Sequence, residues 1–533
     1  MFRRMLNKKT DCKFEIDEGV LQEFCNKNQT LWNNTEDKKR EYIYIGFFMV
    51  EKWIPWLERK ILYAKGLQEK TGAVPIILDW GHNDKLEKLY LSYGIHSISM
   101  KQEMFSNVAG CIYGMWNSFK FLISGATGEK IINMKYHDVK VGHFIYDTII
   151  RTNQDIYTIR DARNRTCLKK TWTTYWFLHT LEKVCKRNPP IHYIFDDLVY
   201  DEGMIATYLR SKGCKISNFD LDNRRLLPEY TNDIIYWPDF YKDIMKHELD
   251  ELSALQKDKF VQMADNMLTE RFQAKNGNIR DSKAAFTGKK MASKEELITY
   301  MKLDPNKKNV VFCCHTLSES AHRCSHQAYV DTYTWMEETM KYVRNKNNAN
   351  WIIKVHPIAA KKYGEGGVLE ELYNKYKSDN LYWYPDEFNS SLIGELADVV
   401  VTIYGHVGSE YSCMGIPVIL SGNAEYAGFG YTIDAFTKEE YQKALDKADT
   451  IPRLTDEQKK IAKLIFACQN QRKLLTDDIF TQEMTVRNWN IDTEVLKGKS
   501  TEELNTQTLQ WIKEYSDKFD LKETDYYKAG CRQ

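Results

Sequence analysis

The sequence has little of what marks membrane-spanning and nucleic-acid-binding proteins. Its 533 residues carry 75 Lys plus Arg against 74 Asp plus Glu. The resulting formal charge of +1 gives no net field to attract a nucleic-acid backbone or an anionic membrane. The longest apolar run, residues 42–50, is about half of the roughly 20 residues that a helix needs to cross a bilayer, and it is typical of a buried strand. We expect no transmembrane segment and no nucleic-acid partner.

Cysteine spacing and the start of the chain suggest a cytoplasmic protein. The 12 cysteines show neither disulfide-framework spacing nor paired CxxC motifs. Basic residues 3–9 are not followed by an apolar signal-peptide core or a cleavage site. We therefore predict a reducing, cytoplasmic location. Residues 3–9 and the aromatic segment 53–62 could add a peripheral contact at the inner face of the membrane, with burial of 53–62 against a sheet as the alternative.

Proline and glycine are also scarce, at 11 and 27 residues, which favours long helices joined by short turns. The apolar pattern alternates between strand and helix periods in two successive series. This alternation predicts an α/β fold with two Rossmann-like, doubly wound domains facing each other across a cleft. The expected parts are an N-terminal arm (1–40), a first domain (41–280), a second domain (281–475) and C-terminal helices (476–533).

The segment 397–419 has the pattern of a phosphate site. A buried strand ends at Ile403, a glycine-containing turn follows, and a helix opens near Ser409, so free backbone N–H groups and a positive helix end should meet at a strand terminus. Glu410 could accept hydrogen bonds from ribose hydroxyls. Alternatively, the glycines only let strand and helix pack closely, and Glu410 complements the helix dipole. The candidate binding residues are Gly405, His406, Gly408, Ser409 and Glu410.

A second candidate lies at the end of the preceding strand, 351–355. Pro357 stops this strand and fixes His356 at its carboxyl end. A histidine there can donate to a phosphate oxygen, and Lys354 could add a positive charge. A surface or capping histidine is the alternative, and the spacing ahead of 397–419 favours the phosphate contact.

Residues 195–203 place four carboxylates at the end of a strand and the start of a helix. Crowded like charges raise the pKa of at least one carboxyl group, as a general base acting on a hydroxyl requires. Helix capping by Asp201 with Glu202 in the first turn is one alternative, and a divalent-metal site is another. We take Asp201 as the leading base candidate, with Glu202 beside it.

Residues 313–326 hold several cysteines and histidines, but their spacing fits no standard zinc motif. Adjacent cysteines on a strand point to opposite faces, so we expect no metal here and no resident cofactor. A loop that brings His315, Ser318 and His322 near a substrate is the favoured interpretation.

Asp147 and Arg151 lie four residues apart on an expected helix. A structural salt bridge is the default interpretation. An arginine that binds an anionic substrate is the alternative.

Taken together, these motifs resemble those of bacterial capsule and surface-polysaccharide glycosyltransferases of the two-Rossmann (GT-B) fold. The likeness rests on Asp201-Glu202-Gly203, His356-Pro357 and Gly408-Ser409-Glu410, and on the phrases at 141–147, 335–339 and 428–431. Within that group, bacterial sialyltransferases and Kdo transferases carry a comparable acidic-Gly motif, a His-Pro motif and a Ser/Thr phosphate motif.

The resemblance implies a metal-independent transfer of a sugar, such as a Kdo- or sialic-acid-like ulosonic acid, from a nucleotide sugar to a saccharide or lipid-linked acceptor. It implies Asp201 as general base, His356 as donor-phosphate contact and Ser409 with its neighbouring amides as phosphate cradle. The first domain would then take the acceptor and the second the nucleotide sugar. Sialyltransferases often show a doubled Ser/Thr where this chain has Gly408-Ser409-Glu410, which leaves CMP, UDP and GDP open as the donor nucleotide.

Three alternatives share this pattern. A polymer-forming glycerophosphate transferase would use a CDP-alcohol, and a UDP-sugar 2-epimerase would need no acceptor. A non-catalytic scaffold of the capsule assembly machinery would bind no nucleotide.

Overall fold

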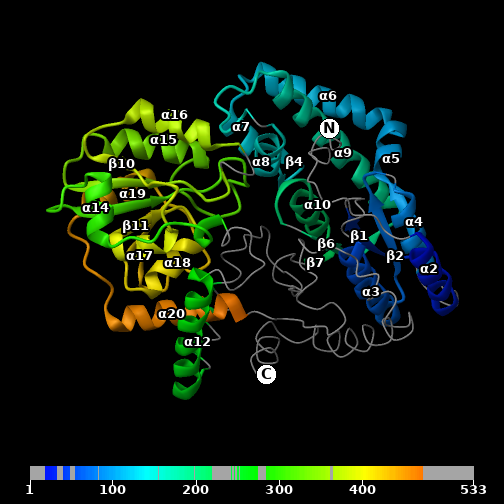
Figure 1. Cartoon of the computed structure of the whole chain (residues 1–533). Helices are drawn as coiled ribbons and strands as arrows, with labels where there is room; N and C mark the ends of the chain where they lie inside the picture. The colour runs from blue at the N-terminus through cyan, green and yellow to red at the C-terminus, as the bar shows by residue number, and fades with distance from the viewer. Residues whose placement is uncertain are drawn as a thin grey trace. The chain divides into compact units, whose positions relative to one another are not determined.

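The chain forms two compact units (Figure 1). Unit 1 comprises Met1–Thr152, Arg160–Ile235 and Lys473–Gln533, and unit 2 comprises Asn153–Ile159 and Tyr236–Arg472. The computed structural model describes residues 18–32, 40–47, 54–81, 83–153, 155–196, 198–218, 242, 245–246, 249–250, 252–273, 284–359 and 364–471.

Unit 1 is built on a five-stranded parallel sheet in the order β3-β2-β1-β6-β7. The chain runs outward from the central β1 through β2 to β3, then returns to the other side of β1, so the winding direction reverses between β1 and β6. Apolar strands such as β1 suit a sheet that is covered on both faces. The strands are β1 (Tyr42–Phe47), β2 (Val74–Asp79), β3 (His96–Ser99), β6 (Pro190–Phe195) and β7 (Lys215–Asn218), besides a short antiparallel pair, β4 (Lys135–Tyr136) and β5 (Val139–Lys140).

Nine helices of unit 1 lie within the described residues. Their bounds are α2 (Glu18–Trp32), α3 (Ile54–Thr71), α4 (Asp84–Ser92), α5 (Met100–Ser106), α6 (Val108–Ile123), α7 (Gly128–Ile132), α8 (Gly142–Thr152), α9 (Arg165–Arg187) and α10 (Tyr200–Ser211).

Unit 2 repeats this plan with six parallel strands in the order β10-β9-β8-β11-β12-β13. The winding direction reverses between β8 and β11. The core holds large side chains such as Trp351, whose ring centroid lies 5.7 Å from that of Phe312 on the next strand. The strands are β8 (Lys308–Cys313), β9 (Ala349–Lys354), β10 (Leu381–Trp383), β11 (Val399–Thr402), β12 (Val418–Leu420) and β13 (Thr432–Asp434).

In the sequence, the described helices of unit 2 begin with α12 and α14, before the first strand β8, and end with α19 and α20, after the last strand β13. Their bounds are α12 (Ala254–Phe272), α14 (Lys294–Met301), α15 (Thr332–Val343), α16 (Gly366–Tyr376), the 3-10 helix η3 (Ser390–Leu392), α17 (Ile393–Leu396), α18 (His406–Cys413), α19 (Lys438–Asp446) and α20 (Asp456–Gln471).

These sheets confirm the predicted α/β class and its two Rossmann-like, doubly wound units. The strand expected at 351–355 is present as β9, and the strand expected to end at Ile403 is β11, which ends at Thr402. The cleft between the domains stays a prediction. No helix among the described residues is long and apolar enough to cross a membrane.

The boundary between the units differs from the expected one. We expected the second domain to start at residue 281, whereas unit 2 begins at Tyr236 and includes α12. The difference arises from tertiary contacts, because two ion pairs join α12 to α20. Lys460 Nζ lies 3.0 Å from Asp258 Oδ1, and Lys463 Nζ lies 2.7 Å from Asp265 Oδ1. The basic segment 3–9 and the expected C-terminal helices (476–533) lie outside the described residues, as does most of the arm (1–40).

Unit 1 contains a buried histidine that should make folding depend on pH. Burial lowers the pKa of His192 on β6 to about 3, and its Nε2 lies 2.7 Å from Ser217 Oγ. The unfolded chain binds a proton near pH 6.5, so the stability due to a neutral His192 is complete above about pH 7 and is lost as the pH falls toward 3. Between pH 7 and 4.5 we expect this residue to lower the free energy of unfolding by about 2–3 kcal/mol.

Urea denaturation across this pH range measures the effect. His192→Gln should unfold with a shallower pH slope than the wild type, whereas the exposed His96→Gln should keep the wild-type slope. Parallel slopes for wild type and His192→Gln would contradict the prediction.

Candidate functional site

Unit 2 contains a cavity of about 270 Å³ at the carboxyl ends of its central strands. Its wall includes the residues that directly follow β8, β9 and β11, where the winding direction of the sheet reverses. Ligands of open α/β sheets bind at this kind of position, because the loops on either side of the reversal diverge and leave a crevice. The polar lining residues are Arg271, His315, Glu319, Arg323, Lys354, His356, Ser390, Thr402, Tyr404, His406, Glu410, Tyr411, Glu425, Tyr426 and Gln469.

The end of β8 contributes a neutral histidine. Burial is the main cause that lowers the pKa of His315 to about 3, and repulsion from a protonated His356 would act in the same direction. Its Nε2 lies 3.2 Å from Thr402 Oγ1, while the Thr402 hydroxyl donates to the carbonyl of Cys313 at 3.2 Å. Nε2 therefore carries the ring proton, and Nδ1 is left as a hydrogen-bond acceptor. Burial raises the pKa of Cys313 to about 12, so this thiol stays protonated and is a poor metal ligand.

The end of β9 contributes a buried cation. The side chain of Lys354 is only 7% exposed, and desolvation lowers its pKa. Its Nζ donates to the carbonyl of Val355 at 3.3 Å and lies 5.2 Å from the ring centroid of Tyr384. Within the described part of the chain, Lys354 forms no ion pair with a carboxylate. An anion in the cavity would supply that missing charge.

His356 follows at the turn after β9, as predicted. Its Nδ1 accepts a hydrogen bond from the backbone N–H of Ile358 at 3.4 Å. This contact assigns the ring proton of the neutral imidazole to Nε2, which makes Nε2 the donor of the ring. The predicted pair of Lys354 and His356 thus lines one cavity.

The end of β11 leads into α18, whose first residues line the cavity. Gly405 is the N-cap, and α18 begins at His406. The first N–H groups of a helix have no intrahelical acceptor, so the amides of His406 and Val407 can serve an anion. Glycine at position 405 leaves room for the imidazole of His315, because a Cβ there would lie 3.0 Å from His315 Nε2.

The remaining residues predicted for this segment are placed differently from our expectation. Because α18 begins three residues earlier than predicted, Gly408 and Ser409 lie inside the helix and do not line the cavity. Ser409 is buried and its hydroxyl donates to Gln469 Oε1 at 2.9 Å, and a Cβ at Gly408 would collide with Tyr426 Oη. Glu410 does line the cavity, but its Oε1 lies 2.5 Å from Arg271 Nε. The packing alternative therefore describes Gly408, and an ion pair accounts for Glu410.

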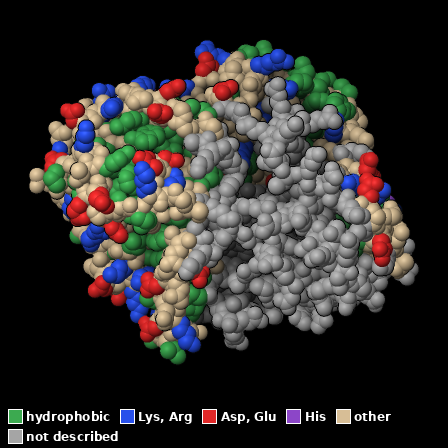
Figure 2. All heavy atoms as spheres, in the orientation of Figure 1, with side chains coloured by type: hydrophobic (Ala, Val, Ile, Leu, Met, Phe, Trp, Pro, Cys, Tyr) green, Lys and Arg blue, Asp and Glu red, His purple; other side chains and the backbone are tan. Residues whose placement is uncertain are grey.

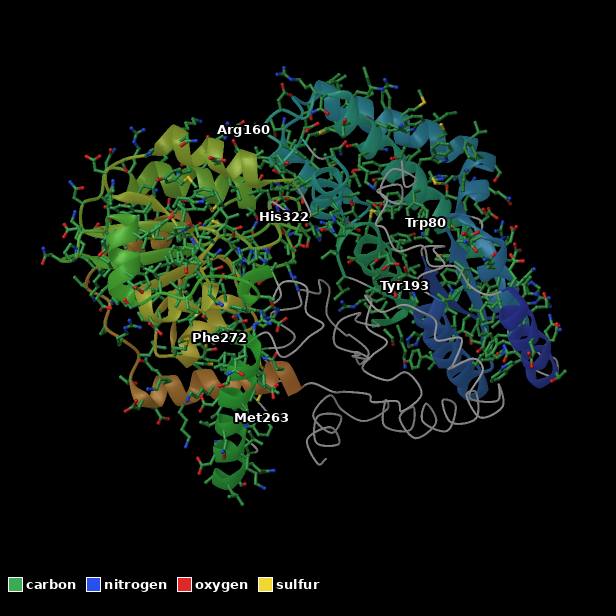
Figure 3. The ribbon with its side chains drawn as sticks, viewed as in Figure 1. Trp80, Arg160, Tyr193, Met263, Phe272 and His322 are labelled. Atoms are coloured by element: carbon green, nitrogen blue, oxygen red, sulfur yellow. The ribbon has the colours of Figure 1, made fainter. Side chains whose placement is uncertain are left out.

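Arg271 is a cavity residue that the sequence did not reveal, because its segment was assigned to the first domain. It belongs to α12, which carries the labelled Phe272 and Met263 in Figure 3. The Phe272 ring packs on Phe286 and Tyr411, with centroids 5.5 and 6.4 Å apart. Helical periodicity running on beyond residue 252 was the signal available in the sequence.

The loop after β8 does not bring all three of its predicted residues to the cavity. His315 lines the cavity, whereas Ser318 and the half-buried His322 (Figure 3) do not. Ser318 is held instead by the fully buried Glu365: its hydroxyl donates to Oε1 at 2.5 Å and its amide to the same atom at 2.9 Å. The amide of Leu317 donates to Oε2 at 2.7 Å. Ser318 thus anchors the loop that carries His315.

This anchor predicts a stability effect. In Glu365→Gln, the amide group would face at least one backbone donor, which leaves a buried group unsatisfied. We expect the free energy of unfolding to fall by about 2–3 kcal/mol, measured by chemical denaturation. The exposed Glu370→Gln on the same helix should change it by less than about 0.5 kcal/mol. Equal stability of the two variants would show that the anchor contributes nothing.

The predicted carboxylate cluster lies at the winding reversal of unit 1, after β6. Asp201 Oδ1 lies 2.6 Å from Lys170 Nζ of α9, and Glu202 accepts a hydrogen bond from the Asp196 amide at 3.2 Å. Desolvation raises the pKa of the Asp196 carboxyl group, even though Lys60 Nζ lies 2.7 Å from its Oδ1. Asp197 is outside the described residues.

The backbone beside Asp201 is unusual, because Tyr200 has a φ of 56°, a region that bulky residues seldom adopt. Arg151 of α8 lies over the Tyr200 ring, with the guanidinium carbon 6.0 Å from its centroid. Asp147, on the same helix, is buried. Both candidates of α8 therefore belong to unit 1 and not to the cavity of unit 2.

Comparison with known proteins agrees with the predicted resemblance for unit 2. Residues 252–457 match the family model of capsule polysaccharide biosynthesis proteins, which confirms the resemblance over that part of the chain. No curated protein sequence matches the chain at a significant level.

Solved structures with similarity to the chain are distant. KpsC of Thermosulfurimonas dismutans, a β-Kdo 2,7 transferase, is 15% identical, with 62% of this chain and 89% of that chain covered and a TM-score of 0.30. S. aureus MnaA with UDP is 11% identical, with coverage of 80% and 91% and a TM-score of 0.24. A variant of the wall teichoic acid polymerase TagF is 11% identical, with coverage of 94% and 96% and a TM-score of 0.22. Scores this low decide neither fold nor function.

Proposed function

We propose that this chain is a glycosyltransferase that moves a sugar from a nucleotide sugar to a growing bacterial surface polysaccharide. The nucleotide phosphate would bind in the cavity of unit 2, and the sugar would be an ulosonic acid of the Kdo or sialic acid type. The match of residues 252–457 to capsule polysaccharide biosynthesis proteins supports the pathway. The composition of the cavity supports the ligand class.

The observation that carries this proposal is the buried Lys354 at the end of β9, in the wall of the cavity. A lysine that is 7% exposed and forms no ion pair with a described carboxylate is costly to bury, unless a ligand brings the opposite charge. His356 Nε2 and the first amides of α18 add uncharged donors on the same cavity wall. A phosphate group is the common biological anion that uses a cation and several N–H donors at once.

In the proposed reaction, negative charge develops on the phosphate of the leaving nucleotide. Lys354, His356 and the α18 amides would stabilise that charge at fixed positions, which lowers the barrier without rearrangement of the site. The neutral His315 can accept a hydrogen bond through Nδ1, from a sugar or ribose hydroxyl. We propose Asp201 of unit 1 as the base that takes the proton of the acceptor hydroxyl, with Glu202 as its neighbour. This scheme needs no resident cofactor.

Calorimetric titration of the full chain with CMP, CDP, UDP and GDP tests the site. We expect one nucleotide to bind with at least tenfold preference, and His356→Ala to weaken that binding about tenfold through loss of one charge-assisted hydrogen bond. Preference for CMP would support an ulosonic acid donor. Absence of binding by all four nucleotides at millimolar concentration would reject the proposed site, and hydrolysis or epimerisation of the sugar without transfer to an acceptor would reject the transferase.

A further inference from the structure

Helix α6 of unit 1 packs on α9 through an unusual face. Three of its four buried residues are small, namely Gly110, Gly114 and Ser118, and the fourth is Phe121. A Cβ at Gly114 would lie 2.5 Å from the carbonyl oxygen of Trp172, and the Ser118 hydroxyl donates to the carbonyl of Leu168 at 2.9 Å. These close contacts fix the rotation of α6 about its axis. The large side chains on the opposite face of α6 therefore cannot turn toward the protein.

The opposite face of α6 is large, apolar and exposed. Thirteen large apolar side chains are well exposed among the described residues, and seven of them fall between positions 105 and 123. Figure 2 shows a hydrophobic patch over the part of unit 1 where Figure 1 places α6. The seven side chains, called here the α6 stripe, are 51–69% exposed. Six lie on α6, namely Val108, Ile112, Met115, Trp116, Phe119 and Ile123, and Phe105 precedes them at the end of α5.

Lysine side chains lie at both ends of the α6 stripe. Helix α6 contains no Asp or Glu, and Lys120 Nζ lies 5.2 Å from the ring centroid of Trp116 within the stripe. Lys101 of α5 and Lys183 of α9 are exposed near its other end, where Lys183 donates to Asn107 Oδ1 at 2.8 Å. The carboxylate of Glu103 is neutralised by Arg187, 2.6 Å away. An apolar stripe with lysines at both ends complements a surface of acyl chains and anionic phosphates.

The dimensions of the α6 stripe fit a bilayer surface better than a second copy of this chain. Sixteen residues of helix span about 24 Å, too short to cross a bilayer but sufficient to lie along it. A stable protein interface takes roughly 20–30 residues from each side, whereas this stripe offers seven. Interfacial helices that bind membranes carry this combination of Trp, Phe and aliphatic residues with flanking lysines.

We propose that the α6 stripe docks unit 1 onto a bilayer that contains anionic lipids, with α6 lying in the plane of the head groups. Phe119, Ile112 and Met115 enter the boundary between head groups and acyl chains, and Lys120 contacts lipid phosphates. This docking is independent of the reaction proposed for the cavity. It would hold the enzyme where a lipid-linked acceptor is found.

Vesicle flotation of the full chain tests the docking. We expect the wild type to float with vesicles of equimolar phosphatidylcholine and phosphatidylglycerol, and to bind pure phosphatidylcholine at least tenfold more weakly. The triple variant Ile112→Gln, Met115→Gln, Phe119→Gln should lose at least tenfold in binding to the mixed vesicles. The matched control Leu255→Gln, Met291→Gln, Tyr300→Gln removes equally exposed apolar side chains from unit 2 and should float like the wild type.

A second variant, Lys120→Glu, tests the charge contribution without removing apolar surface, and should reduce binding to the mixed vesicles severalfold. Circular dichroism shows whether each variant is folded. The proposal is overturned if the wild type does not float, if it binds both kinds of vesicle equally, or if the triple variant floats as well as the wild type. It is also overturned if light scattering shows a dimer that the triple variant converts to a monomer, because the stripe would then cover a second copy.

Discussion

Lys354→Met should lose turnover of the nucleotide sugar by about 10²–10³-fold, because the substitution removes a buried positive charge of the cavity that forms no ion pair with a carboxylate among the described residues. Affinity for the preferred nucleotide should fall at least tenfold in calorimetric titration. The fold should be kept, because methionine fills nearly the same volume and burying an uncharged side chain costs less than burying an ammonium group. The free energy of unfolding is therefore expected to be equal or slightly higher.

The matched control is Lys341→Met, which removes an exposed lysine from α15 in the same unit. It should leave turnover, affinity and stability within twofold or about 0.5 kcal/mol of the wild type. If Lys354→Met binds the nucleotide as tightly as Lys341→Met does, the phosphate does not bind at Lys354, and the proposed donor site is in the wrong place.

Asp201→Asn is expected to lower turnover by about 10²–10⁴-fold while leaving nucleotide affinity unchanged, because the substitution removes the proposed base but no residue of the donor cavity. The structure also offers a plain alternative, since Asp201 forms an ion pair of 2.6 Å with Lys170 and both side chains are largely buried. Breaking this pair from either side should lower the free energy of unfolding by about 1–3 kcal/mol. Loss of activity through instability therefore has to be separated from loss of the base.

Lys170→Met makes that separation, because it breaks the same ion pair and keeps the carboxylate. If Asp201 is the base, Lys170→Met retains at least about a tenth of the wild-type turnover, whereas Asp201→Asn does not. Equal losses in the two variants, measured well below their melting temperatures, would assign Asp201 a structural role only. A second carboxylate of the cluster, Glu202, would then be tested in the same way.

The two candidate regions differ in what the structure already explains. Asp196, Asp201 and Glu202 of the carboxylate cluster each have a protein partner, so ion pairs and hydrogen bonds account for much of it. In the cavity of unit 2, by contrast, Lys354 forms no ion pair with a described carboxylate, and the neutral His315 leaves Nδ1 as an acceptor. The cavity is therefore the stronger candidate for ligand binding, and the match to capsule polysaccharide biosynthesis proteins covers it.

Periodicity in the sequence alone determined the α/β class and most of the strands, because strands buried on both faces read as continuous apolar runs bounded by turns. The same local signals placed His356 at the end of β9, since proline after an apolar strand stops it. They also placed Gly405 and His406 at the turn after β11. Strand positions and the turns that end strands depend on a few neighbouring residues, so a short stretch of sequence is enough to predict them.

Only the tertiary structure decided which of these residues share a site. The Ser409 hydroxyl donates a hydrogen bond to Gln469, sixty positions along the chain, and the Ser318 hydroxyl donates to Glu365. Neither partner could be predicted from a local motif. Arg271 reaches the cavity because α12 packs on α20, a contact between segments about 200 residues apart. Likewise, glycine packing against α9 determines which face of α6 is exposed. Hydrogen bonds, ion pairs and burial join residues by distance in space, whereas the sequence pattern reports only distance along the chain.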